Sequence, residues 1–102
     1  MIRHIVLAQI RPDVDEAAMA DLFAELRTIV DLVPGIGAIH AGRSESPEGI
    51  ERGYTHGFTV DFDGWAALAA YQAHPAHRAV GARLVSYTQG GIDGICVLDV
   101  PG

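Results

Sequence analysis

The sequence contains only one cysteine, Cys96, so no disulfide can form within the chain. Proteins without disulfides are typical of reducing compartments, and we therefore expect a cytoplasmic location. Because Ile95 and Val97 flank the cysteine, we expect it to be a small buried hydrophobic side chain rather than a reactive thiol.

Basic residues are also scarce, with 7 Lys and Arg against 13 Asp and Glu and a formal net charge of −6. They form no cluster, so the basic surface that nucleic-acid binding requires is missing, and the acidic balance argues against anionic membranes. No apolar run approaches the roughly 20 residues that span a bilayer. The apolar start, Met1 to Leu7, is too short for a signal peptide and lacks a cleavage site with small residues. We therefore expect neither a nucleic-acid nor a membrane partner.

The 102 residues suffice for one compact domain, 1–102, and no repeat, linker or low-complexity segment divides them. Hydrophobic periodicity and turn residues predict the order strand, helix, strand, strand, helix, strand. The strands are expected at about 2–10, 37–43, 53–62 and 95–100. The first helix is expected from Asp13 or Asp15 to about Val33, and the second helical region covers 64–72 and 75–87. This order predicts a ferredoxin-like α+β fold, with one antiparallel sheet and helices on one face.

The first predicted strand is apolar on both faces, with Ile5 and Leu7 on one side and Val6 and Ala8 on the other. Helices cover only one of these faces, so a monomer would leave the other in water. The outward residues of the third strand are small enough to let a second sheet approach: Thr55, Gly57 and Thr59. We therefore expect a homodimer with the two sheets face to face as a sandwich or barrel, the alternative being a monomer with an apolar sheet face.

A phenol and two imidazoles lie within one short segment, from Tyr71 to His77. Pro75 disfavours helical geometry at His74, so one helix should end there and another begin at the proline. His77 then lies near a helix N-terminus, where the backbone dipole favours a neutral imidazole that can accept a proton. With Tyr71 as a weak acid nearby, this pattern is typical of proton transfer on a small carbonyl compound. The alternative is a buried amphipathic pair whose polar atoms are satisfied by the backbone.

His4 and His56 lie on strand faces that otherwise carry apolar side chains. If their strands are neighbours, both point beneath the helices and join Tyr71 and His77 around one apolar cavity, the usual form of a small-molecule site. Either histidine could instead be a core residue satisfied by a neighbour. A metal site formed by His74 and His77 with one of these histidines is a further alternative. No carboxylate lies near 74–77 to support such ligands, so we expect no metal.

Three groups of residues resemble the stress-responsive A/B barrel domain family, also called Dabb. They are Ile2 to Leu7, the segment Ser46-Pro47-Glu48-Gly49 leading to Gly53-Tyr54-Thr55-His56, and Tyr71 with His74-Pro75-Ala76-His77. The resemblance covers nearly the whole chain. It implies a ferredoxin-like α+β homodimer in which two sheets form a barrel, with a small-molecule pocket between sheet and helices.

One member type of this family is a cofactor-free polyketide cyclase, and the resemblance to it implies residue roles. Its catalytic tyrosine and histidine match Tyr71 and His77, so Tyr71 would bind the developing oxyanion and His77 would act as general base. Its pocket histidines match His4 and His56, whereas Leu26 stands in place of a pocket tyrosine. The substrate-binding residues expected in this chain are His4, Val6, Phe23, Leu26, His56, Phe58 and His74.

Three candidate functions follow from these residues and the resemblance. The first is a cofactor-free polyketide cyclase or lyase that uses Tyr71 and His77 as an acid–base pair. The alternatives are a non-catalytic small-molecule binding or stress-related barrel protein, in which the same groups form a satisfied hydrogen-bond network, and a protein similar to the cofactor-independent monooxygenases.

Overall fold

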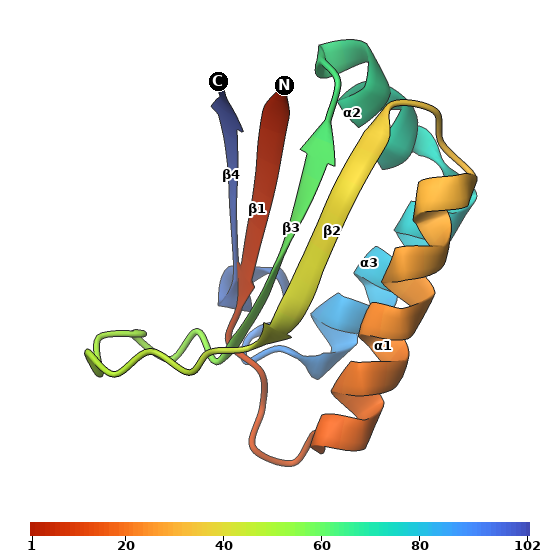
Figure 1. Cartoon of the computed structure of the whole chain (residues 1–102). Helices are drawn as coiled ribbons and strands as arrows, with labels where there is room; N and C mark the ends of the chain where they lie inside the picture. The colour runs from red at the N-terminus through yellow and green to blue at the C-terminus, as the bar shows by residue number, and fades with distance from the viewer.

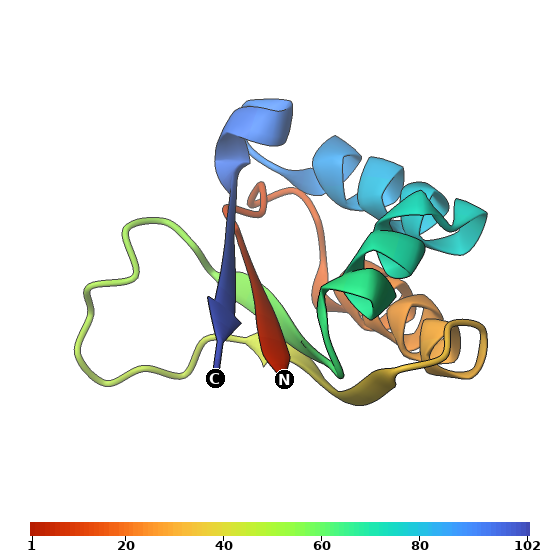
Figure 2. The same cartoon turned by 90° about the horizontal axis from the view of Figure 1, so that it is seen from above.

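A computed structural model describes residues 1–102 as one four-stranded sheet covered on one face by helices (Figure 1, Figure 2). The strands are β1 (Ile2–Ala8), β2 (Ile36–Arg43), β3 (His56–Phe62) and β4 (Ile95–Pro101). The helices are α1 (Glu16–Thr28), α2 (Trp65–Ala73) and α3 (Pro75–Tyr87), with short 3-10 turns η1 (Ile29–Asp31) and η2 (Gly91–Gly94). The sheet order is β2-β3-β1-β4 and every neighbouring pair is antiparallel, which confirms the predicted ferredoxin-like fold.

Several element boundaries differ from the predicted ones. The first helix begins after Asp15, whose side chain accepts a hydrogen bond from the Ala18 backbone N–H at 2.8 Å, but its α-helical part ends at Thr28 rather than near 33. The first strand ends at Ala8, and Ile10 forms only an isolated bridge with Thr88. The third strand begins at His56 instead of Gly53, because Arg52 and Gly53 have positive φ angles of 56° and 85° and form a turn.

The break between α2 and α3 lies where the proline predicts it. His74 adopts an extended conformation with φ −72° and ψ 136°, and Pro75 is the first residue of α3. The His74 ring completes the new helix end, because its Nδ1 accepts a hydrogen bond from the Ala76 backbone N–H at 3.0 Å. The chain therefore turns sharply here and brings the first turn of α3 over the sheet beside the end of α2 (Figure 1).

The core lies between the helices and the inward face of the sheet. The buried strand side chains alternate as predicted, and those of β3 are His56, Phe58, Val60 and Phe62. The largest fully buried helix side chains that pack against them are Met19, Leu22, Leu26 and Tyr71. Full burial of each large apolar side chain stabilises the fold by roughly 1.5–3 kcal/mol, so this layer holds the helices on the sheet.

The opposite face of the sheet is apolar and uncovered. Leu7, Leu98 and Val100 are 37%, 54% and 49% exposed, and Cys96 also lies on this face, opposite Leu7 in the strand pairing. The prediction of a buried cysteine is therefore wrong for the single chain, because Cys96 is only partly covered. The connection between β2 and β3 extends outward on the side of the sheet away from the helices (Figure 2). None of the helices is both long enough and apolar enough to cross a membrane.

Candidate functional site

A cavity of about 250 Å³ lies between the sheet and helix α3. Strands β1, β3 and β4 form its floor, and α3 with the end of α2 forms its roof. Its polar side chains are His4, Tyr71, Gln72 and His77. The other lining residues are apolar apart from Gly81 and include Val6, Phe58, Val80, Leu84 and Val85. An apolar cavity with a few convergent polar groups has the composition of a small-molecule site.

His77 lies in the first turn of α3 and presents one free ring nitrogen. Its Nδ1 lies 3.2 Å from the Gln72 carbonyl oxygen, which can only accept, so Nδ1–H donates and Nε2 carries the lone pair. Nε2 makes no hydrogen bond within the chain. Burial lowers the pKa of His77 below its usual value, against a smaller opposing effect of the Gln72 carbonyl. The imidazole is therefore neutral at pH 7 and able to accept a proton.

Tyr71 provides the complementary donor. Its side chain is 0% exposed, and its hydroxyl is the one buried side-chain polar atom of the chain without a hydrogen-bond partner. Burial raises the pKa of Tyr71 well above its usual value, so the hydroxyl stays protonated. Its ring centroid lies 4.3 Å from that of His77. A buried hydroxyl without a partner costs about 1–3 kcal/mol, a cost that a hydrogen bond to a ligand oxygen would remove.

His4 enters the cavity from β1 and is held by Asp99 of β4. The two residues face each other in the strand pairing, and His4 Nδ1 lies 2.6 Å from Asp99 Oδ1. The carboxylate accepts a hydrogen bond from Nδ1–H, and Nε2 has no partner in the chain. The His4 ring centroid is 5.8 Å from that of Tyr71. His4, Tyr71 and His77 therefore converge as predicted.

Asp99 is a functional candidate that the sequence reasoning missed. Ile95, Val97 and Asp99 of β4 lie on the helix side of the sheet. An acidic residue on this otherwise apolar face is the sequence signal that points to Asp99. The pattern was not decisive, because the partner of Asp99 depends on the antiparallel register between strands 95 residues apart.

His56 lies away from this cavity, although it shares the inward face of β3 with Phe58. Its Nε2 lies 3.0 Å and 3.1 Å from the two carboxylate oxygens of Glu16, and its Nδ1 lies 2.7 Å from the Thr55 hydroxyl. Arg43 binds the same carboxylate at 2.8 Å. The hydrogen bond from His56, followed by that from Arg43, lowers the pKa of Glu16. Both ring nitrogens of His56 are thus occupied, which is the arrangement of a satisfied core histidine.

The remaining predicted site residues divide into two groups. Val6 and Phe58 line the cavity. Phe23 and Leu26 are buried in the core on α1, and His74 caps α3, so these three lie outside the cavity lining. Ligand contact by Phe23, Leu26, His56 and His74 stays a prediction.

The histidines do not assemble as a metal site. No group of three or more His, Cys, Asp or Glu side chains lies close enough together to hold a metal ion. The alternative set of three imidazoles that includes His74 and His77 is therefore not brought together by this fold.

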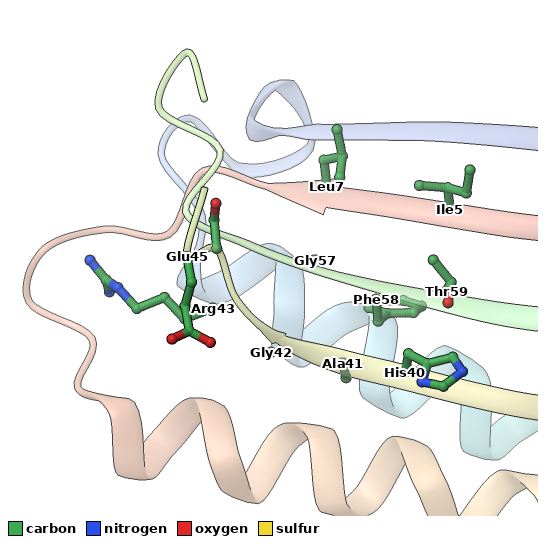
Figure 3. A pocket seen from close by; sticks show the side chains of 11 residues that line it. Ile5, Leu7, His40, Ala41, Gly42, Arg43, Glu45, Gly57, Phe58 and Thr59 are labelled. Carbon is green, nitrogen blue, oxygen red and sulfur yellow. The ribbon is translucent and has the colours of Figure 1, made fainter. Parts of the chain in front are cut away.

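A second hollow of about 710 Å³ lies on the sheet face away from the helices (Figure 3). Ile5 and Leu7 of β1, Thr59 of β3 and His40 of β2 border it, and Gly57 lies at its centre (Figure 3). A side chain at Gly57 would place Cβ 2.9 Å from the Val6 carbonyl oxygen, so a residue larger than glycine would require the backbone to shift. Its lining combines four apolar residues, Ile5, Leu7, Ala41 and Phe58, with polar residues of β2, β3 and the loop after β2.

The fold and the cavity define a ferredoxin-like α+β domain with a largely apolar pocket between sheet and helices. The family model of the stress responsive A/B barrel domain, Dabb, matches residues 2–101, and the chain belongs to this family. The stress-response A/B barrel domain-containing protein HS1 of Arabidopsis thaliana is 31% identical over 98 residues, which are 96% of this chain and 86% of that protein.

Two further relatives are enzymes by name. The olivetolic acid cyclase of Cannabis sativa is 25% identical over 80 residues, covering 78% of this chain and 79% of that protein. The hydroxynitrile lyase of Passiflora edulis has a TM-score of 0.82 at 18% identity, covering 97% and 90% of the two chains, and this likeness shows the fold alone.

A dimeric ferredoxin-like protein of unknown function from Jannaschia sp. CCS1 has a TM-score of 0.88 at 31% identity, covering 99% of this chain and 98% of that chain.

Proposed function

We propose that this Dabb domain carries out cofactor-free acid–base chemistry on a small carbonyl compound in the cavity under α3. The observation that carries the proposal is the unpartnered buried hydroxyl of Tyr71 beside the neutral imidazole of His77, both lining one apolar cavity. A protonated donor and an unprotonated base at the same place are the two groups that enolate formation requires.

The reaction step follows from the roles of these two groups. His77 Nε2 takes a proton from the carbon next to the substrate carbonyl, and the C–H electron pair moves to form the enolate. The Tyr71 O–H donates a hydrogen bond to the enolate oxygen as its charge develops. In a cyclase, the enolate carbon then attacks a second carbonyl carbon of the same substrate, and the new alkoxide takes the proton back from His77. His4, oriented by Asp99, holds the substrate through its free Nε2.

The olivetolic acid cyclase supports an assignment to carbonyl chemistry, because it is similar to this chain over most of both lengths. Its name describes its own product, and this chain departs from the cyclase pattern at Leu26, which stands in place of a pocket tyrosine. The cavity here, of about 250 Å³, has no residue of α1 in its lining. We therefore assign the substrate class, an aromatic or polyketide-like carbonyl compound, and not the compound.

The second candidate function is binding without catalysis. A satisfied hydrogen-bond network, as in a purely structural cluster, would pair the Tyr71 hydroxyl with His4 or His77, but that hydroxyl has no partner. An open hydroxyl still suits a barrel protein that binds and releases a carbonyl compound unchanged. Ligand binding without turnover would identify this function.

A ligand screen tests the site directly. Thermal unfolding is measured with aromatic acids, β-ketoesters and divalent metals for the wild type, Tyr71→Phe and His77→Ala, with Tyr87→Phe, outside the cavity lining, as the matched control. A ligand at a hundred times its Kd stabilises by about 2.7 kcal/mol, which raises the Tm by several degrees. A shift with carbonyl compounds in the wild type and control but not in the two site variants is expected. Silence of the wild type toward every organic compound contradicts the proposal.

We also propose that the chain forms a homodimer through the outer sheet face. Leu7, Leu98 and Val100 expose apolar surface there, and the flat centre around Gly57 leaves room for a second sheet. The protein from Jannaschia sp. CCS1 is described as dimeric, which supports a dimer of this chain. We also propose a cytoplasmic location, because a chain with the single cysteine Cys96 forms no internal disulfide.

Replacement of Leu98 by glutamate tests the dimer. A charge within an apolar interface leaves an unpaired buried carboxylate, so Leu98→Glu should elute as a monomer where the wild type is a dimer. Ala69→Glu, on the exposed side of α2, is the control and should stay dimeric. Light scattering that reports a monomeric wild type would refute this part of the proposal.

A further inference from the structure

Gly81 lies in α3 at a position where glycine destabilises the helix and the backbone conformation does not require it. It lies in the interior of the helix Pro75–Tyr87 and is absent from the glycines with positive φ, so its backbone conformation is open to any residue. Glycine in a helix interior is destabilising relative to alanine, because the unfolded chain loses more conformational freedom. A reason for the glycine must come from what surrounds it.

The space beside Gly81 is empty and belongs to the cavity. A Cβ atom built on Gly81 would meet no heavy atom within 4 Å outside its own helix backbone and its chain neighbours. Gly81 lines the cavity together with His77 and Val85, one turn before and one turn after it on the same helix face. The helix therefore presents the imidazole, then a gap one turn long, then an apolar side chain.

A larger side chain at this position would obstruct the imidazole. Side chains on a helix lean toward its N-terminus and lie over the residues three and four positions earlier, so a side chain at 81 would lie over His77. The free Nε2 of His77 and the unpartnered, fully buried hydroxyl of Tyr71 need a ligand to reach them. Absence of a side chain at 81 keeps that approach open.

Two apolar residues of the cavity lining, Ile92 and Val97, are 69% and 49% exposed, so the cavity reaches the surface beside them. Exposure of large apolar side chains without a partner is unfavourable. We propose that Gly81 is a specificity-determining residue that accommodates the hydrocarbon part of the ligand between His77 and the exposed Ile92 and Val97. This inference rests on the proposed function and adds the shape of its substrate: a carbonyl head with an apolar tail.

The test uses 4-alkylacetophenones with methyl, propyl and pentyl chains as probes, and measures Kd by calorimetry. Four proteins are compared at one concentration: wild type, Gly81→Ala, Gly81→Leu and Ala82→Leu. The last variant adds the same side chain to the adjacent exposed position of α3 and is the matched control. Each protein is also unfolded thermally without ligand, because the two readouts should move in opposite directions.

The wild type and Ala82→Leu should bind more tightly with each added methylene, by up to about fourfold where the group is fully buried. Gly81→Leu should lose this chain-length dependence and bind the pentyl compound at least about tenfold more weakly, since it displaces two or more buried methylenes. Gly81→Ala should unfold about 2–8 °C higher than the wild type, because the site is helical and open.

Two results would overturn the inference in distinguishable ways. If the wild type binds the series and Gly81→Leu binds it equally well, Gly81 does not set specificity, and the proposed function stands. If the wild type binds none of the probes, the proposed site for carbonyl compounds fails and the inference fails with it. A Gly81→Ala protein that is less stable than the wild type would show that the space beside the helix is filled.

Discussion

Replacement of Tyr71 by phenylalanine should stabilise the free protein while it weakens function. The substitution removes one buried hydroxyl that has no hydrogen-bond partner and keeps the ring, which packs at 5.1 Å from Phe62 and 4.3 Å from His77 between centroids. A buried unpaired polar group costs about 1–3 kcal/mol, and its removal leaves the core contacts in place. We expect a gain of about 1 kcal/mol, the lower end of this range.

Urea unfolding at fixed protein concentration measures this gain. With a slope of about 1.5 kcal/mol per molar urea, a gain of about 1 kcal/mol raises the midpoint by roughly 0.7 M. The Tm should rise by about 4–8 °C. The control is Tyr87→Phe, which removes a hydroxyl that accepts a hydrogen bond from Arg83 Nε at 3.1 Å and should bring no gain. A Tyr71→Phe protein that is destabilised by about 1 kcal/mol would refute the reasoning, because the hydroxyl would then have a partner in the free protein.

Other perturbations separate the working groups from the structural ones. His77→Gln should lower kcat about 10²- to 10⁴-fold with little change in the urea midpoint, because it removes a base whose side chain is only partly buried. Since burial lowers the pKa of His77, wild-type kcat should be constant above pH 7 and fall only below pH 6.5. The same shift stabilises the folded state at high pH, and this stabilisation is lost as the pH falls through the folded-state pKa of His77. His56→Ala should instead cost more than about 2 kcal/mol of stability, seen as a lower urea midpoint, because it empties a core site and breaks the pair with Glu16. A double-mutant cycle on kcat/KM with His4→Ala and Asp99→Asn should give a coupling energy of about 0.5–3 kcal/mol, whereas additivity would mean that Asp99 does not orient His4.

The fold was predictable because local signals agree with one another. Residues 56–62 alternate between large and small side chains, which specifies the inward face of β3, and Pro75 marks the helix break. The antiparallel pairing of β1 with β3, expected from the ferredoxin-like order, places His4 opposite Val60 on that same inward face. The convergence of His4, Tyr71 and His77 follows from these elements.

Other parts of the site depend on distances that no local pattern contains. His56 has the same parity in β3 as Phe58, but it lies at the end of the strand, where Glu16 at the start of α1 reaches it. Whether a histidine there faces a cavity or a carboxylate is decided by how far α1 extends over the sheet. The role of Gly81 likewise depends on empty space beside it, which only the packing of α3 against its neighbours determines.

Hydrogen–deuterium exchange of a carbonyl compound tests the central claim most directly. Ethyl benzoylacetate is incubated in D₂O at a concentration that saturates binding, and the loss of its acidic C–H signal is followed by NMR for wild type, His77→Ala and Tyr71→Phe. If His77 is the base and Tyr71 stabilises the enolate, the wild type exchanges the proton faster than buffer, Tyr71→Phe is slower, and His77→Ala returns to the buffer rate. A wild type that binds the compound in this cavity and leaves its exchange at the buffer rate would contradict acid–base catalysis and identify the protein as a binding barrel.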